Sequence, residues 1–138
     1  MGRTLLGMLA GVIVCMVTIS AVHALGHAIY PPPPGIDPSN ADDVPAWVAV
    51  APMGALVFVL AAWLTGTFVG ASVGARIARH PRAAAFLVAL VVMTGVGAMI
   101  VKVPQHPQWL SALGFMLPLP IAWIAARLFG ARPAPLPE

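Results

Sequence analysis

Charged residues are scarce in this chain: Asp, Glu, Lys and Arg make up only 8% of its 138 residues. A soluble domain carries about a quarter of such residues, so these few could not cover the surface of a water-soluble globule. Hydrophobic residues make up 60% of the chain, and its mean hydropathy is +0.94. The composition therefore excludes an ordinary soluble enzyme and a disordered tail, and it indicates a membrane protein whose main partner is the lipid bilayer.

Positive charge is also weak, although the pI is near 10. Seven basic and four acidic residues leave a formal net charge of only +3, which is too little for the basic face that nucleic-acid binding needs. Cysteine is represented by Cys15 alone, so no disulfide can form within these residues. We therefore expect no nucleic-acid partner and no disulfide framework.

The main feature of the sequence is a set of four long apolar runs. Each is close to the length of about 20 residues that a helix needs to cross a hydrocarbon core about 30 Å thick. Arg127 is the only charged residue inside them, and none alternates as the strands of a barrel do. The chain is predicted to be an all-α bundle of four transmembrane helices in one domain, with helices at 4–30, 46–75, 83–101 and 109–129 and an outer loop at 31–45.

The basic residues predict the orientation of this bundle. With four spans, six arginines fall on one side of the membrane, and Lys102 is the single base on the other side. The excess of positive charge marks the cytoplasmic side, so both termini are expected in the cytoplasm. A cleaved signal peptide is the alternative for the first run, but the stretch from Thr4 to Val22 is long for one. The six arginines are Arg3, Arg76, Arg79, Arg82, Arg127 and Arg132.

Glycines at every fourth position predict close helix packing. Small residues at this spacing form a smooth groove that lets another backbone approach closely. The first two helices are expected to cross at these grooves, or one groove joins a second subunit. The glycines are Gly7 and Gly11 in the first helix and Gly66, Gly70 and Gly74 in the second.

Prolines predict where the helices end or bend. Pro31–Pro34 removes four backbone donors and should end the first helix near Tyr30. Pro52 is expected within an early turn of the second helix. Pro118 follows Leu117 in the fourth helix, and we expect a kink there.

Three histidines on the outer side form the one group of side chains that suggests a catalytic or metal-binding site. His23 and His27 lie one turn apart on the same face of the first helix, and His106 lies between the third and fourth helices. Together, or with Asp37, they could supply ligands for zinc or copper. The alternative is that each histidine hydrogen-bonds a neighbouring helix or loop. The chain contains no H-E-x-x-H motif, so the general base of a zinc peptidase is absent.

Two short motifs resemble an uncharacterised family of small bacterial four-helix integral membrane proteins. One is the H-x-x-Y-P-P-P-P-G-x-D stretch from His27 to Asp37, and the other is the later H-P-x-W from His106 to Trp109. The likeness covers most of the chain and implies no activity, but it implies a multi-pass protein of a bacterial inner membrane. It does imply that His27, Tyr30, Asp37, His106 and Trp109 form a group on the outer face.

The sequence thus favours a structural or accessory membrane protein without a cofactor, which packs through its glycine faces as a homo-oligomer or within a larger complex. One alternative is a metal-binding protein or metal-dependent membrane enzyme that uses His23, His27 and His106. Another is a small channel or carrier lined by the second helix and the kinked fourth helix.

Overall fold

The structure, a computed structural model, describes residues 2–103 and 106–130, and all regular elements in this part are α-helices. Four spans are long and apolar enough to cross a membrane: α1, α3, α4, and α5 together with α6. This confirms the predicted all-α, four-span fold of a multi-pass membrane protein. The helices are α1 (Gly2–Ile29), α2 (Val44–Val50), α3 (Met53–Ile77), α4 (Pro81–Lys102), α5 (Gln108–Met116) and α6 (Pro118–Phe129).

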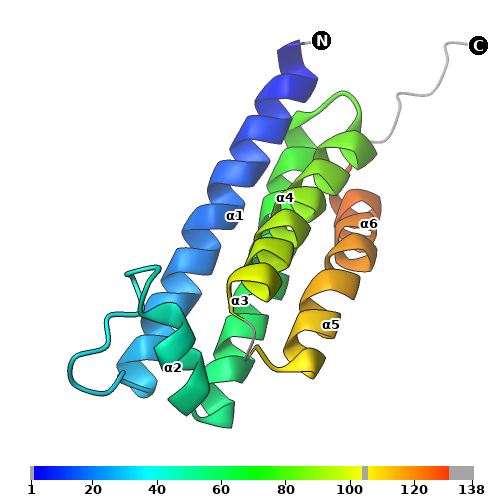
Figure 1. Cartoon of the computed structure of the whole chain (residues 1–138). Helices are drawn as coiled ribbons and strands as arrows, with labels where there is room; N and C mark the ends of the chain where they lie inside the picture. Colours follow the sequence, from blue (N-terminus) through cyan, green and yellow to red (C-terminus); the bar gives the residue numbers. More distant parts are fainter. Residues whose placement is uncertain (1, 104–105, 131–138) are drawn as a thin grey trace, which may run out of the picture.

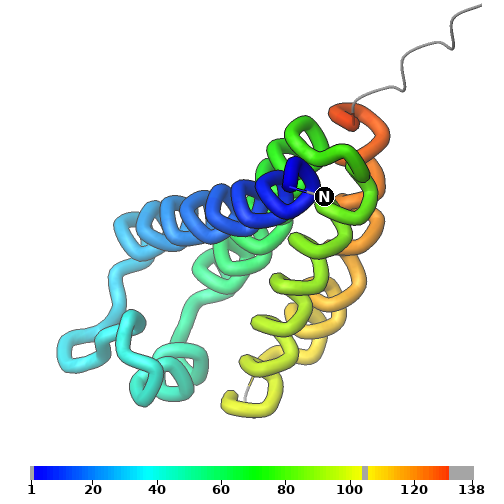
Figure 2. The backbone as a smooth tube through the Cα atoms, turned by 90° about the horizontal axis from the view of Figure 1, so that it is seen from above, coloured from blue at the N-terminus to red at the C-terminus, as the bar shows by residue number. Residues whose placement is uncertain are grey.

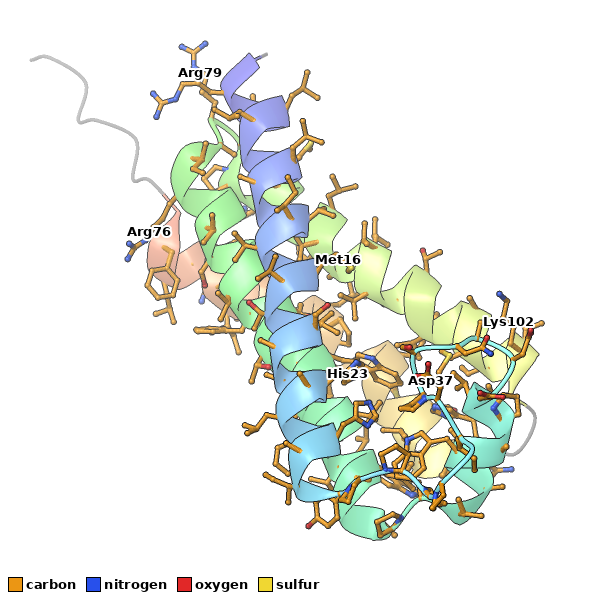
Figure 3. The ribbon with its side chains drawn as sticks, turned by 90° about the vertical axis from the view of Figure 1, so that its left-hand side faces the viewer. Met16, His23, Asp37, Arg76, Arg79 and Lys102 are labelled. Atoms are coloured by element: carbon orange, nitrogen blue, oxygen red, sulfur yellow. The ribbon has the colours of Figure 1, made fainter. Side chains whose placement is uncertain are left out.

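The spans lie alongside one another, while α2 and the loop before it cover one end of the bundle (Figure 1). We name residues 31–50 the cap segment and the end that it covers the cap end. The start of α1 and the α3–α4 connection lie at the opposite end, which we name the terminal end. Arg76 and Arg79 lie at the terminal end, and Lys102 and Asp37 lie at the cap end (Figure 3). Arg132 is outside the described residues.

The predicted helix at 46–75 is not continuous, which corrects the expectation for Pro52. The chain forms α2, leaves the helical conformation at Ala51 and Pro52 with ψ angles of 131° and 154°, and then begins α3. Proline disfavours the helical region for the residue before it and has no N–H to donate. The break turns α2 away from α3, so that α2 becomes part of the cap segment instead of lengthening a span.

The other proline predictions agree with the structure. The first helix ends at Ile29, just before the proline run. The last span is divided at Leu117 into α5 and α6, where the kink was expected. Leu117 itself keeps helical angles, with φ −79° and ψ −26°, and its N–H donates to Leu113 O at 3.0 Å. The bend is therefore mild, and α5 and α6 together still form one span.

The α1–α3 contact is made by the glycines of both helices. A Cβ atom added at Gly7 would lie 2.8 Å from Gly74 O, and one at Gly11 would lie 2.9 Å from Gly70 O. A Cβ at Gly66 would collide with the side chain of Ile19. Real Cβ atoms do not approach backbone atoms so closely, so only glycine allows this separation. The two glycine grooves therefore face each other within the chain.

Helices α1 and α4 touch near the terminal end and separate toward the cap end. At the point of contact, a Cβ added at Gly11 would lie 3.0 Å from the Val88 side chain. Further along α4, a Cβ added at Gly95 would meet no atom within 4 Å. Figure 2 shows the two helices close together near the N-terminus and spread apart at their other ends. The bundle is thus tightly packed at one end and open at the other.

Candidate functional site

A cavity of about 320 Å³ lies at the cap end between α1, α3, α4 and α5. Its walls are mainly apolar side chains, and the cap segment contributes Pro38 and Trp47 to its lining. Among the described residues no Asp, Glu, Lys or Arg lines it, and its titratable side chains are His23, His27 and His106. All three histidines singled out in the sequence therefore face one cavity.

The cavity reaches the membrane-facing surface between α1 and α4. Met16 of α1 and Gly95 of α4 both line it. Both are also exposed, and the side chain of Met16 keeps 40% of its accessible surface. A membrane-soluble molecule could therefore enter the cavity between α1 and α4 directly from the bilayer, without passing the cap segment.

His23 and His27 belong to the α1 wall of the cavity. Their rings are 6.5 Å apart between centroids, and the His27 ring lies 6.1 Å from that of Trp47 in the cap segment. The Nε2 atom of His23 is buried and has no hydrogen-bond partner. Figure 3 shows His23 on the side of α1 that faces the cap segment. Buried polar atoms are nearly always paired, but this nitrogen is closed to solvent, so a molecule in the cavity could reach it only if the His23 ring turned.

His106 belongs to the opposite wall, between α4 and α5. Its Nδ1 is hydrogen-bonded to Oγ of Ser111 at 2.8 Å, and its ring stacks on Trp63 of α3 with centroids 6.0 Å apart and planes 13° apart. Burial lowers the pKa of His106 below its ordinary value. The ring is therefore neutral near pH 7 and held in a fixed orientation.

Trp63 owes its position to a glycine on the last span. A Cβ added at Gly114 of α5 would lie 2.5 Å from the indole ring of Trp63. The absence of a side chain at Gly114 therefore lets the indole pack directly against α5 and next to His106. Trp63, Gly114 and Gly95 all shape the cavity, and the sequence reasoning assigned none of them to a site.

Asp37 organises the cap segment from outside the cavity. Its Oδ1 accepts hydrogen bonds from N and Oγ of Ser39 at 2.9 and 2.6 Å, and its own N–H donates to Oδ2 of Asp43 at 3.1 Å. The bond from the Ser39 hydroxyl is the main reason why the pKa of Asp37 is lowered. These bonds fix the turn that places Pro38 over the cavity.

The outer-face group expected from the resemblance is divided among different neighbours. Tyr30 packs edge to face on Phe58 of α3 with ring centroids 6.1 Å apart, and Trp109 packs against the buried core. Asp37 lies in the exposed turn of the cap segment. Only His27 and His106 of this group face the cavity.

The structure does not gather the histidines as metal ligands. Within residues 2–103 and 106–130, no three His, Cys, Asp or Glu side chains are close enough together to hold a metal ion. His23, His27 and His106 share a cavity, but Ser111 and Trp63 hold His106 on the wall opposite the other two. The arrangement offers hydrogen-bonding groups on two sides of a space instead of three ligands around one point.

Comparisons with protein-family models, curated proteins and solved structures find no match to this chain. The resemblance to small bacterial four-helix membrane proteins stays a prediction, and the cavity carries the functional argument.

Proposed function

We propose that this small integral membrane protein binds an uncharged, mainly apolar small molecule in the cavity at its cap end. The observation that carries the proposal is a cavity of about 320 Å³ whose described lining is apolar apart from three histidines. Neutral imidazoles can donate or accept a hydrogen bond, so this lining suits a mainly apolar ligand with a hydrogen-bonding group.

The charge of the lining determines the charge of the ligand. Since no acidic or basic side chain of the described residues lines the cavity, an ionised ligand would be buried without a counter-ion, which is strongly unfavourable. The volume of about 320 Å³ is at the lower end of the range for small-molecule sites. Both properties favour a small neutral ligand that reaches the cavity from the bilayer between α1 and α4.

The other functions considered from the sequence have less support. A structural or accessory role would use the glycine faces to bind another subunit. These faces already contact each other in the α1–α3 packing within the chain. The exposed side chains of α1, such as Leu5, Leu9 and Ile13, are those that lipid tails would cover. A carrier is the alternative closest to the present proposal, since it also needs a binding cavity.

We place the cap end on the outer side of a bacterial inner membrane, with both termini in the cytoplasm. The arginines at the terminal end support this orientation (Figure 3). The ligand would then be held in the outer half of the bilayer.

The experiment fills the cavity with a side chain. Gly95 lines the cavity, whereas Gly97 does not, and a Cβ at either glycine meets no atom within 4 Å. Gly95→Phe should therefore occupy the space that the ligand needs, and Gly97→Phe is the matched control. Each protein is purified from membranes in mild detergent, and its bound small molecules are extracted and identified by mass spectrometry.

We expect a neutral molecule that co-purifies with the unchanged protein and with Gly97→Phe, but not with Gly95→Phe. If the three proteins carry the same molecules in the same amounts, the cavity is not a binding site and the proposal is wrong.

A further inference from the structure

We infer that the ligand is a lipid with an uncharged polar head, and that one hydrocarbon chain of this lipid lies lengthwise in the cavity. Its head lies at the cap end, and its chain points toward the middle of the bilayer. This inference rests on the proposed function, because it names the class of molecule that the same cavity would take. It follows from the length of the cavity, the distribution of polar groups along it and the position of its opening.

The cavity is long and narrow and runs along the helices. On α1 its lining extends from Met16 to His27, which is about 16 Å at about 1.5 Å per residue. On α4 the lining extends from Val91 to Met99, which is about 12 Å on the same scale. A volume of about 320 Å³ spread over such lengths has an average cross-section of about 20–27 Å², close to that of one extended hydrocarbon chain. A single chain therefore suits this shape better than a compact molecule of the same volume.

The polar side chains of the lining are gathered at one end of the cavity. His23 and His27 lie in the last two turns of α1, and His106 lies in the connection that follows α4 at the cap end. Ile19 and Met16, one and two turns deeper on α1 than His23, are apolar, and so are all the lining residues of α4. Polar groups are costly to bury among apolar ones. A polar head therefore suits the cap end, and a hydrocarbon chain suits the deeper end.

This direction is the one that a lipid already has in the half of the bilayer next to the cap end. Met16 is near the middle of α1 (Gly2–Ile29), so the apolar end of the cavity reaches about the middle of the span. Trp47 of the cap segment lines the other end, and tryptophan side chains are typical of the depth of the lipid head groups. A lipid can therefore move from the bilayer into the cavity without turning over.

The opening between α1 and α4 lets the chain enter sideways. Met16 and Gly95 line the cavity and are exposed, and a Cβ at Gly95 would meet no atom within 4 Å. Closer to the terminal end the two helices meet, since a Cβ at Gly11 would lie 3.0 Å from the Val88 side chain. The cavity is thus closed beyond its deep end, and a chain too long for it has to leave through the opening.

Packing and charge together select the lipid. The walls of an empty apolar space lose the dispersion contacts that a neighbouring group would make, and a hydrocarbon chain restores them. No acidic or basic side chain of the described residues lines the cavity, so a charged head drawn under the cap segment would be desolvated without a counter-ion. The head is therefore an uncharged group, such as the hydroxyl or ester of a long-chain alcohol or a monoacylglycerol.

The test uses photo-crosslinking with two forms of dodecan-1-ol, one with a diazirine at the chain end and one with a diazirine next to the hydroxyl group. The full chain in lipid nanodiscs is irradiated with each probe, and the labelled residues are mapped by mass spectrometry. Val92 and Val96 report on the deep end, because they line the cavity and are only 4% and 1% exposed. Trp47 lines the cavity, is 7% exposed and reports on the cap end. Lipid outside the protein has little access to these three side chains.

We expect the chain-end diazirine to label Val92 and Val96, and the diazirine next to the hydroxyl group to label Trp47. Gly95→Phe should abolish this labelling, whereas Gly97→Phe, the matched control outside the cavity, should keep it. An excess of unlabelled dodecan-1-ol should reduce the labelling several-fold. The same excess of dodecyltrimethylammonium or dodecylphosphonate, which carry the same chain on a charged head, should not. The competition uses the unchanged protein, so it decides the question even if Gly95→Phe does not fold.

Several outcomes would overturn the inference. If the chain-end diazirine labels Trp47 but neither valine, the chain does not point toward the middle of the bilayer. If the charged competitors act as well as dodecan-1-ol, the head is not selected for lack of charge. Either result shows that the inference is wrong.

The co-purification experiment separates this inference from the proposed function. If neither probe labels the buried lining, but another neutral molecule co-purifies with the unchanged protein and not with Gly95→Phe, the inference is wrong and the proposed function stands. If neither probe labels it and no small molecule distinguishes Gly95→Phe from Gly97→Phe, both fail.

Discussion

Trp63 and His106 stack with ring centroids 6.0 Å apart and planes 13° apart, although they come from different parts of the chain. Trp63 lies in the middle of α3, and His106 lies between α4 and α5. Their contact joins the second span to the start of the last span at the wall of the cavity. A change in the packing between these two spans would therefore also change the shape of the cavity.

The first prediction tests, at Gly114, whether the packing of the spans determines the position of Trp63. In Gly114→Ala the new Cβ would lie 2.5 Å from the Trp63 ring, so the indole must move and its stacking on His106 must weaken. Overpacking of this kind costs about 1–3 kcal/mol, and we expect a lower midpoint of thermal unfolding in detergent and a shifted tryptophan emission maximum. Gly97→Ala is the control, since a Cβ there meets no atom within 4 Å. Equal midpoints for the two variants would contradict the prediction.

The second prediction concerns pH. Burial lowers the pKa of His106, so the unfolded chain, with a histidine pKa near 6.5, binds more protons than the folded protein just below that pH. Stability should therefore be constant above about pH 6.5 and decrease as the pH falls below it. We expect His106→Gln to have a shallower decrease in unfolding midpoint between about pH 7 and pH 5.

The slope of the unfolding midpoint against pH should therefore be smaller in His106→Gln than in the unchanged protein. His80→Gln serves as the comparison. A slope in His106→Gln equal to that of the unchanged protein would show that His106 is not the group concerned.

The third prediction concerns the break before α3. In Pro52→Ala the constraint on Ala51 is removed, and α2 can continue into α3 as one helix, which draws the cap segment away from the cavity. Val48 is a residue of the cap segment that lines the cavity, whereas Val50 is 56% exposed. We expect Val48→Cys to react slowly with a maleimide in the unchanged background and several-fold faster with Pro52→Ala, as judged from gel-shift time courses.

Val50→Cys provides the matched control, because it should react quickly in both backgrounds. The native Cys15 is buried and adds little to the signal. If Val48→Cys reacts at the same rate with and without Pro52, the cap segment is held by its other contacts and the prediction fails.

The fourth prediction tests the orientation. Ser39 lies in the exposed turn of the cap segment, and Arg79 lies at the terminal end. With both termini in the cytoplasm, a membrane-impermeant maleimide should label Ser39→Cys in intact bacterial cells, and it should label Arg79→Cys only after the cells are permeabilised. The reverse pattern would place the cap end in the cytoplasm.

Hydropathy alone was enough to predict the four spans, because a bilayer requires each span to be a long apolar helix with its own backbone hydrogen bonds. The kink at Leu117 was also predictable, since a proline acts on its immediate neighbours. The break at Pro52 was missed because the apolar run from 46 to 75 continues across it. In that run the local effect of proline outweighs the hydropathy pattern.

The cavity could not be predicted in the same way. Its histidines were recognised from their predicted place on the outer side of the membrane and from the one-turn spacing of His23 and His27. Its volume, however, depends on the separation between α1 and α4. That separation follows from the fit of Gly11 against Gly70 and Val88 at the other end of the bundle. No local pattern around His23 or His106 contains this information, and the orientation of His106 depends on Trp63, which lies more than forty residues earlier.

The glycines act as spacers that set the distance between the backbones of α1 and its neighbours. A Cβ added at Gly11 would lie 2.9 Å from Gly70 O and 3.0 Å from the Val88 side chain, so a single methyl group there would push α1 away from α3 and α4. His27 lies about 24 Å further along α1, at about 1.5 Å per residue, so a tilt of about 5° at Gly11 would move it by about 2 Å. The width of the opening beside Gly95 is therefore sensitive to one missing methyl group at the other end of the bundle.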